Sequence, residues 1–345
     1  MDFLHAPFVG IEPATSFLRR LSWISLLSML TSGCVLGRPS KVQIQAGRTV
    51  PAGASVSASP PFLKVATFNI WGLPSWINGA DPNRYGRIAR ELDRLGSDVV
   101  LLQEVWTRRP FEVLSEKDKG SARTWWVASA RWKGGFLGQN GLLTLSKYPI
   151  EAGEIRHFST ASMPDSLMHK GALKITVTIR SGLRVNIWNT HLQDGGSKRV
   201  RSRQIAELIR WVRDATDNQC ADIVGGDFNS TPDSEEFRQL TAAIGPSVHQ
   251  LANQAELPTW DGLKPASGEG ESLDHIFVRM TRPSFEVRPW SRRVFTASRL
   301  EDRLSDHMGI ESLLTFAPAE ESGSVPLALP RISSLLPGVS ALLNR

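Results

Sequence analysis

The chain has 345 residues, of which 41% are hydrophobic and 21% charged, as in an ordinary globular protein. Only Cys34 and Cys220 are present, which excludes a disulfide framework. The formal net charge of +6 favours acidic or phosphate-bearing partners, without choosing between nucleic acid, an anionic membrane surface and a small phosphoester. The 11 tryptophans suit either a core or an interface between water and lipid.

The N-terminal region reads as an export signal. Arg19 and Arg20 precede an apolar run over 21–30, too short to span a bilayer comfortably, and Thr31-Ser-Gly-Cys34 follows. This resembles a bacterial lipoprotein signal, although Thr31 stands where that family usually has Leu. We therefore expect residues 1–33 to be removed, and the exported chain to be lipid-anchored in a bacterial membrane through Cys34. The alternatives are an ordinary signal peptide, giving a periplasmic or secreted protein, and a wrongly assigned start.

Beyond the signal, the chain divides into three parts. Residues 34–61 are rich in Gly, Pro, Ser and Ala and predict a flexible tether. Residues 62–316 alternate apolar runs with amphipathic segments and predict the folded domain. In 317–345 prolines interrupt leucines, which predicts disorder or short apolar pieces that dock on a surface. Within the domain we expect strands at 64–70, 98–105, 141–146, 173–179, 183–192, 221–224, 273–278 and 308–314, and helices at 84–95, 202–214 and 234–244.

Polar residues fall repeatedly at the ends of these predicted strands. Asp227 and Asn229 follow a short buried strand and two glycines, and residues two apart on an extended chain share one face. Taken alone, the stretch reads equally well as an Asx-type turn. However, the pattern recurs through the chain, so we expect one site on a rigid scaffold. The other members are Asn69, Glu104, Asn189, His191, Asp274, Asp306 and His307.

The order of these short motifs resembles the endonuclease/exonuclease/phosphatase superfamily. The motifs are Phe68-Asn, Gln103-Glu-Val, Thr190-His-Leu, Gly226-Asp-Phe-Asn, Leu273-Asp-His and Ser305-Asp-His. The resemblance covers about residues 62–316 and implies an α+β fold, a four-layer α/β/β/α sandwich of two packed mixed β-sheets flanked by helices.

Within that superfamily, the short motifs around these site residues look most like those of neutral sphingomyelinases. Examples are Phe68-Asn-Ile-Trp-Gly-Leu-Pro, Glu104-Val-Trp, Lys170-Gly and Thr259-Trp-Asp. Some secreted sphingomyelinases carry an aromatic-tipped hairpin before the Ser-Asp-His element. Here 284–304 is short and arginine-rich, with Trp290 and Phe295 as remnants, which leaves insertion into a host membrane open.

Phosphodiester hydrolysis needs an activated water and neutralised phosphoryl oxygens. A hard carboxylate such as Glu104 suits Mg²⁺, with Mn²⁺ or Co²⁺ as substitutes, and the resemblance adds Asn69 as a second ligand. His307 is the candidate general base, because an imidazole titrates near neutral pH.

The resemblance assigns the remaining site residues. Asp274 would hold His307, and His191 would donate to a phosphoryl oxygen. Asp227 would orient water or the leaving group, directly or through a second metal ion, and Asn229 would bind phosphate. Asp306 and Lys170 would support the cluster.

We therefore expect a phospholipid headgroup at a membrane surface as the substrate, sphingomyelin first, cleaved to ceramide and phosphocholine. An exported Mg²⁺-dependent nuclease acting on nucleic acid is the first alternative. An inactive surface protein that binds phosphorylated partners is the second. No protein partner is implied.

Two further stretches invite a functional reading. The glycine-rich segment 134–141 lacks the Gly-Lys-Ser/Thr of a phosphate-cradling loop and predicts a mobile hairpin beside the site. The basic run at Lys198, Arg199, Arg201 and Arg203 would hold a nucleic-acid backbone or lipid headgroups, or would simply be a solvated helix start.

Overall fold

The computed structural model describes most of the predicted domain and one short segment before it. The described residues are 41–46, 62–115, 125–130, 137–179, 183–194, 197–215, 221–255, 257–262, 270–282, 285–297 and 302–318. The signal sequence with Cys34, most of the tether, the tail beyond 318 and part of the glycine-rich segment lie outside them. Among the described helices, none is both long and apolar enough to cross a bilayer.

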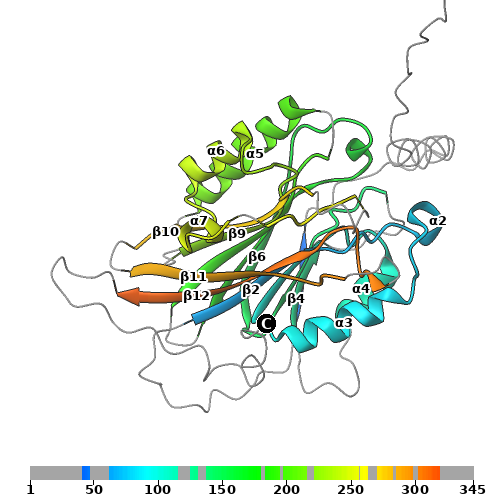
Figure 1. The fold of residues 1–345 in the computed structure, drawn as a ribbon, viewed down its shortest axis with the longest axis horizontal. Coiled ribbons are helices and arrows are strands. Elements are labelled where there is room, and N and C mark those ends of the chain that lie inside the picture. The colour runs from blue at the N-terminus through cyan, green and yellow to red at the C-terminus, as the bar shows by residue number, and fades with distance from the viewer. Residues whose placement is uncertain are drawn as a thin grey trace, which may run out of the picture.

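Two mixed β-sheets form the centre of the molecule (Figure 1). The larger has the order β1-β4-β5-β3-β2-β12-β11. Its strands are β1 Val42–Gln45, β2 Phe62–Asn69, β3 Val99–Gln103, β4 Trp126–Ala130, β5 Leu143–Ser146, β11 Phe285–Val294 and β12 Gly309–Pro318. The smaller has the order β10-β9-β8-β7-β6. Its strands are β6 Ile150–His157, β7 Gly171–Thr178, β8 Arg184–His191, β9 Ala221–Asp227 and β10 Asp274–Met280.

Helices cover the outer face of each sheet (Figure 1). The helices α3 Arg84–Leu95 and α4 Arg108–Ser115 lie against the larger sheet, and α5 Lys198–Asp214 and α6 Glu235–Ala243 against the smaller. Shorter turns of helix are α2 Ser75–Asn78, α7 Val248–Leu251 and the 3₁₀ turn Asp165–Leu167. Serine side chains cap α5 and α6, where Ser197 accepts from the backbone of Val200 and Ser234 from that of Phe237.

Three apolar layers hold the sandwich together. The innermost lies between the sheets and is rich in Val, Ile and Leu, because strands with a helix layer outside them are buried on both faces. The outer layers join α3 and α4 to one sheet and α5 and α6 to the other. The predicted four-layer α/β/β/α sandwich is confirmed.

The prediction of the elements was accurate where their patterns were strong and incomplete elsewhere. The helix expected at 84–95 is α3, and the one expected at 202–214 begins earlier, at Lys198. The flexible tether over 34–61 is wrong for one described stretch, because Val42–Gln45 form β1, paired antiparallel with β4. The tail expected from 317 begins two residues too early, since β12 continues to Pro318.

Candidate active site

Six of the predicted site residues meet at one edge of the sandwich because of how the strands pair. The parallel pairs β2/β3 and β8/β9 end at this edge, whereas the antiparallel strands β10 and β12 begin there. His191 and Asp274 both lie opposite Asp227 in the register of the smaller sheet. Residues from six separate stretches of chain are thereby brought together: Asn69, Glu104, His191, Asp227, Asp274 and His307.

Two glycines before Asp227 allow close packing at this edge. At Gly226, φ is +150°, and a Cβ atom would lie 2.0 Å from the carbonyl oxygen of Thr190 on β8. At Gly225 a Cβ would lie 2.7 Å from Leu101 Cδ1 of the other sheet. Larger residues would separate β8 from β9, or one sheet from the other, and would displace Asp227.

Glu104 follows β3 in a backbone conformation that is rare for a residue with a side chain, with φ at +59°. Its Oε1 accepts from Asn69 Nδ2 at 3.1 Å and its Oε2 from Trp106 Nε1 at 3.2 Å. Burial raises the pKa of the Glu104 carboxyl, and the neighbouring Asp306 carboxylate raises it further. A strained backbone and two hydrogen bonds fix the position of the Glu104 carboxylate, as is typical of a residue in a functional site.

Asn69 joins two carboxylates of the site. Its Nδ2 donates to Glu104 and also to Asp227 Oδ2, at 2.9 Å, while its Oδ1 accepts from the backbone N–H of Trp71 at 3.0 Å. The side chain was predicted to be a metal ligand. In this arrangement it positions Glu104 and Asp227 relative to each other.

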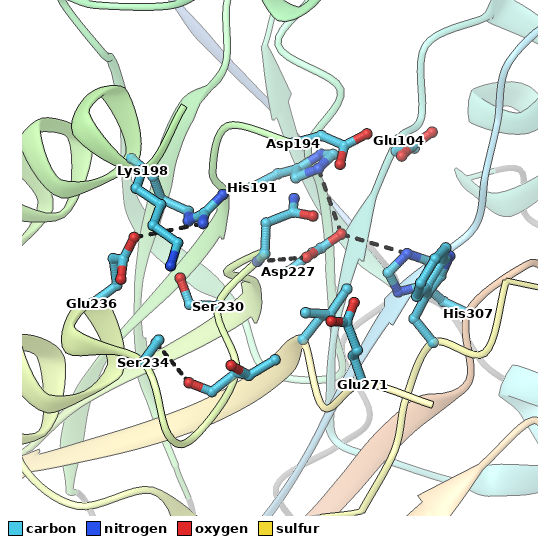
Figure 2. Close-up of a pocket in the computed structure, with 15 residues that line it drawn as sticks. Glu104, His191, Asp194, Lys198, Asp227, Ser230, Ser234, Glu236, Glu271 and His307 are labelled. Carbon is cyan, nitrogen blue, oxygen red and sulfur yellow. Dashed lines mark hydrogen bonds and ion pairs between the residues drawn. The ribbon is translucent and has the colours of Figure 1, made fainter. Parts of the chain in front are cut away.

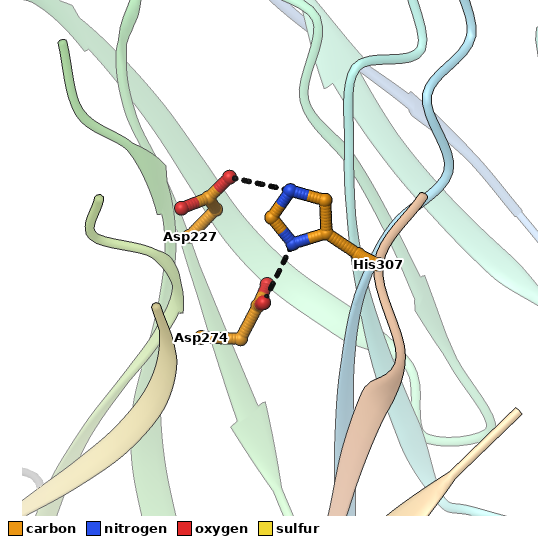
Figure 3. Close-up of side chains that lie close together, drawn as sticks. All are labelled: Asp227, Asp274 and His307. Atoms are coloured by element: carbon orange, nitrogen blue, oxygen red, sulfur yellow. Dashed lines mark hydrogen bonds and ion pairs between the residues drawn. The ribbon is translucent and has the colours of Figure 1, made fainter. Parts of the chain in front are cut away.

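Asp274 and His307 form a buried pair (Figure 3). His307 Nδ1 lies 2.8 Å from Asp274 Oδ2, which leaves Nε2 directed toward Asp227 Oδ2 at 3.7 Å. Burial lowers the pKa of His307, but Asp274 and Asp227 outweigh it and raise the value to about 10. The carboxylate partner on Nδ1 makes Nε2 the ring atom available for proton transfer.

Asp227 lies at the centre of the group (Figure 2). Its Oδ2 is 3.5 Å from His191 Nε2 as well as 3.7 Å from His307 Nε2, and its Oδ1 accepts from the backbone N–H of Asn229 at 2.9 Å. Burial raises the pKa of Asp227 to about 7 against the opposing effect of His307. Asn229 Nδ2 donates to the carbonyl of Leu192 at 3.2 Å, so this amide faces the same loop.

Lys170 is buried and touches His191 directly. Its Nζ lies 3.0 Å from His191 Nε2, 3.0 Å from the Leu192 carbonyl and 2.7 Å from Asp165 Oδ2. Burial lowers the pKa of His191 well below its usual value, and the Lys170 charge lowers it further. A neutral ring that accepts from Lys170 at Nε2 carries its proton on Nδ1, a buried atom without a hydrogen-bond partner in the described part of the chain. Nε2 is thus the ring atom of His191 that faces Lys170 and Asp227.

Several positioning residues escaped sequence analysis. Asp165 pairs with Lys170 from the start of the 3₁₀ turn, and Arg84 uses its guanidinium to hold three backbone carbonyls beside the site. Thr259 Oγ1 accepts from the backbone N–H groups of Leu273 and Asp274. Single polar residues in loops or at a helix start carry no periodic signal. The sequence indicated Thr259 only through the Thr-Trp-Asp motif to which it belongs.

A pocket of about 380 Å³ opens onto part of this cluster (Figure 2). Glu104, His191, Asp227, Asn229 and His307 form one part of its wall, while Asp306 and Lys170 are buried and do not line it. Lys198 and Arg201 from the predicted basic run line the pocket too, whereas Arg199 and Arg203 are exposed. The run therefore belongs partly to the pocket and partly to a solvated helix face.

The donor set fits a hard divalent cation. Glu104 shares the amide of Asn69 with the buried Asp227, and burial together with the charge of the buried Asp306 raises the pKa of Glu104. A divalent cation would relieve this repulsion through oxygen ligands, the kind that Mg²⁺ prefers. Ligand atoms of Asp227, Asp274 and His307 also lie within 4.8 Å of one another. Because Asp274 already pairs with His307 at 2.8 Å, we favour the Glu104 side for the cation.

Curated proteins with detectable similarity are sphingolipid phosphodiesterases by name. A candidate neutral sphingomyelinase of Drosophila melanogaster is 26% identical over 236 residues, which covers 63% of this chain and 52% of that protein. Sphingomyelin phosphodiesterase 2 of Homo sapiens is 25% identical over 183 residues, or 50% and 42% of the two chains. The chain spans about half the length of the curated relatives it matches.

Solved structures of similar fold come from proteins of diverse activity. An endonuclease/exonuclease/phosphatase from Bacteroides vulgatus superposes with a TM-score of 0.60 at 22% identity, over 74% of this chain and 99% of that one. TDP2 of D. rerio with a single-strand DNA product gives the same TM-score and coverage at 20% identity. The beta toxin of Staphylococcus aureus with bound magnesium ions gives 0.54 at 20% identity, over 72% and 98% of the two chains.

The family is established by a direct match along the sequence. The profile of the Endonuclease/Exonuclease/phosphatase family matches residues 66–307, which begin in β2 and end at the candidate base. This span contains every member of the catalytic cluster, and its fold is that of the solved structures. The chain therefore belongs to the Endonuclease/Exonuclease/phosphatase family and resembles its sphingomyelinases.

Proposed function

We propose that this protein is a metal-dependent phosphodiesterase that removes the headgroup of a phospholipid, with sphingomyelin as the leading substrate and ceramide and phosphocholine as products. The observation that carries the proposal is the buried Asp274–His307 pair, which faces Asp227 and shares its pocket with Glu104. The lipid assignment is supported by the names of the sphingomyelinase relatives.

The side chains divide the chemistry among them. In its neutral form, which a bound cation would favour over the imidazolium, His307 Nε2 takes a proton from the attacking water, while Asp274 holds the ring and stabilises the imidazolium that forms. His191 is the candidate donor to a phosphoryl oxygen, and Lys170 keeps its ring neutral and oriented. Asp227 orients the water through its oxygen between the two histidines.

Glu104 is the candidate ligand for the metal ion, with Asn69 holding it in place. Mg²⁺ is the proposed metal, with Mn²⁺ or Co²⁺ as substitutes. When bound, a divalent cation supplies positive charge that neutralises the phosphoryl oxygens and lowers the pKa of neighbouring histidines.

A nuclease is the second candidate. It is favoured by the net charge of +6 and by the similarity in fold to TDP2, a protein solved with a DNA product. Because one fold hosts many activities, fold similarity does not choose between lipid and DNA. An inactive phosphate-binding protein is the third reading, and the complete catalytic cluster argues against it.

Export with a lipid anchor on Cys34 is a further part of the proposal and rests on the sequence of 19–34. Mass spectrometry of the mature N-terminus tests it. A diacylglyceryl-modified Cys34 at the first position is expected, and an unmodified peptide that begins elsewhere refutes lipidation.

Activity is tested on the domain in its full-length context. Labelled sphingomyelin vesicles and plasmid DNA are incubated with the protein, each with Mg²⁺ and with EDTA. We expect lipid cleavage that EDTA abolishes. DNA cleavage alone overturns the lipid assignment, and cleavage of neither substrate favours the inactive binding protein.

A further inference from the structure

The pocket continues beyond the catalytic cluster, into a part that the proposed reaction does not use. The further wall includes Trp260, Glu271 and Leu273, which lie just before β10 or in the loop that precedes it. Among the described residues that line the cavity, Trp260 is the one Trp, Tyr or Phe. An aromatic ring in an otherwise polar pocket indicates a contact with a particular part of the ligand.

Trp260 lies between Glu271 and the candidate base His307 in an antiparallel arrangement of three chain segments. The backbone N–H of Trp260 donates to the Glu271 carbonyl at 3.0 Å, and the N–H of Glu271 donates to the Trp260 carbonyl at 2.7 Å. On its other side Trp260 bridges to His307, where the N–H of Met308 donates to the Thr259 carbonyl at 2.6 Å. Opposed residues in antiparallel pairing project from the same face, with Cβ atoms about 4.5–5.5 Å apart. Imidazole, indole and carboxylate therefore form a row along one wall of the pocket.

The loop that carries Trp260 is held in place by a buried ion pair. The guanidinium of Arg303 contacts both carboxylate oxygens of Asp261, and the two side chains are 8% and 11% exposed. Because Arg303 precedes the segment that ends in His307, this pair ties the loop to the candidate base. Gly262, with φ at +62°, fits beside the indole, since a Cβ there would lie 3.4 Å from Cη2 of Trp260. The wall is therefore formed before a ligand arrives.

Glu271 supplies a negative charge at the end of this row. Its side chain is exposed and has no ion-pair partner in the described part of the chain, whereas Glu236 in the same pocket pairs with Arg201 at 3.5 Å. Figure 2 shows Glu271 and Lys198 on different sides of the cavity. A carboxylate beside an aromatic ring offers a quaternary ammonium both attractions that it can use, which are the negative ring face and the opposite charge.

A zwitterionic headgroup matches this order of side chains. The proposed reaction places the phosphate between His307, His191 and Asn229. An ammonium joined to that phosphate by a short linker then lies over Trp260 and near Glu271. A headgroup without a cation gains nothing from the indole face, and an anionic headgroup is repelled by the carboxylate.

We propose that Trp260 and Glu271 form a subsite for the quaternary ammonium of a choline headgroup, and that they set the preference of the pocket for that headgroup. The subsite rests on the proposed phospholipid phosphodiesterase function and adds the residues that select the substrate. Asp261 and Arg303 are positioning residues, which act through Trp260 and do not touch the headgroup.

A nucleobase is the competing occupant, because the face of any base can stack on an aromatic ring. The position of Glu271 argues against it. A nucleic acid brings further phosphates into the pocket, and like charges at close range are unfavourable. A single choline phosphate brings a positive charge to the same carboxylate.

The test measures how tightly soluble phosphate monoesters bind to the full-length protein with Mg²⁺, by isothermal titration calorimetry. The probes are phosphocholine, glycerol phosphate, which lacks the cation, and thymidine monophosphate, which carries a base. From the strength of a cation–π contact and an exposed ion pair, we expect phosphocholine to bind about tenfold more tightly than glycerol phosphate.

Variants assign that preference to the two residues. Glu271→Gln and Trp260→Leu should each reduce the ratio of the two Kd values to about threefold or less. Glu271 is exposed, so Glu271→Gln tests the subsite even if the loop is disturbed in Trp260→Leu. The matched control is Glu235→Gln on α6, which removes a carboxylate from a side chain that is 63% exposed and outside the pocket, and it should keep the wild-type ratio.

The outcomes separate the subsite from the proposed function. Equal binding of phosphocholine and glycerol phosphate by the wild type overturns the subsite, as does an unchanged ratio in Glu271→Gln and Trp260→Leu or an equal loss in Glu235→Gln. Tighter binding of thymidine monophosphate than of phosphocholine assigns the wall to a nucleobase and also overturns it. A choline preference that depends on Glu271, in a protein that leaves sphingomyelin intact, supports the subsite and refutes the proposed substrate.

Discussion

Arg84 connects the two halves of the catalytic edge, and its replacement by lysine should misalign them. The residue is 2% exposed at the start of α3. Its Nη1 donates to the carbonyls of Ile70 at 2.5 Å and Leu304 at 2.6 Å, and its Nη2 to the carbonyl of Trp71 at 2.5 Å. Burial lowers the pKa of the Arg84 guanidinium, and the neighbouring Tyr85, Asp306 and Glu104 partly offset this effect.

The expected losses of stability and of catalytic rate in Arg84→Lys follow from those three hydrogen bonds. Ile70 follows the bridging amide Asn69, and Leu304 precedes the Ser-Asp-His segment that ends in His307. A lysine keeps the positive charge but has a single ammonium nitrogen. That nitrogen cannot reach all three carbonyls that the planar guanidinium contacts. Losing one hydrogen bond to a charged group and leaving its carbonyl buried costs about 2–3 kcal/mol. A shift of about 1 Å between catalytic groups costs about 100-fold in rate.

Two assays measure the effect of Arg84→Lys. Urea unfolding should show a free energy of unfolding lower by about 2–3 kcal/mol. Hydrolysis of a soluble phosphodiester should show kcat reduced by about 10- to 100-fold, with KM changed far less, because the substrate contacts remain. The matched control is Arg94→Lys on the same helix, whose side chain is 72% exposed. If Arg84→Lys keeps kcat within about twofold of wild type, or if the control loses as much, this reasoning fails.

Four other changes have defined outcomes. His307→Asn should lower kcat by about 10²–10⁴-fold, and it should also lower the melting temperature because the buried Asp274 loses its charged partner, as followed by kinetics and calorimetry. Glu104→Gln should raise the Mg²⁺ concentration for half-maximal rate at least about tenfold, measured by titration after EDTA treatment, since one anionic ligand is lost. Lys170→Met should destabilise the fold by about 3–5 kcal/mol in urea, because Asp165 is left buried and uncompensated; Lys170→Met with Asp165→Leu should recover part of this. Because the pKa of folded His191 lies below its ordinary value, neutral His191 contributes stability above pH ~6.5 that is lost as the pH falls. The free energy of unfolding of the wild type, minus that of His191→Gln, should therefore fall by about 1.4 kcal/mol for each pH unit below pH ~6.5. A difference that stays constant with pH would contradict the lowered pKa of His191.

The catalytic residues were predictable because each stands at the end of an apolar strand. Asp227 and His191 follow runs that must be buried, and parallel strands β8 and β9 bring such ends together. The stretch from Val224 to Pro232 was ambiguous on its own, since Asp and Asn also favour turns. Its Asp227 proves to be the hub of the site, with both histidines within 3.7 Å.

What the sequence did not predict depends on contacts between distant segments. Arg84 reads as an ordinary polar residue at a helix start, and only the fold shows Leu304, 220 residues away, against its guanidinium. Asp165 begins a 3₁₀ turn of three residues, which is too short to leave a periodic pattern in the sequence. The strand β1 was mistaken for tether because Val42–Gln45 lack a strong apolar run and gain their order from pairing with β4.

The central claim is that this edge of the sandwich cleaves a lipid phosphodiester with a divalent cation. The most direct measurement is release of labelled phosphocholine from sphingomyelin vesicles, run beside plasmid DNA under identical conditions. The account predicts phosphocholine release with Mg²⁺, none with EDTA, and intact plasmid. Nicked plasmid with intact sphingomyelin would contradict it, and so would lipid cleavage that persists in EDTA.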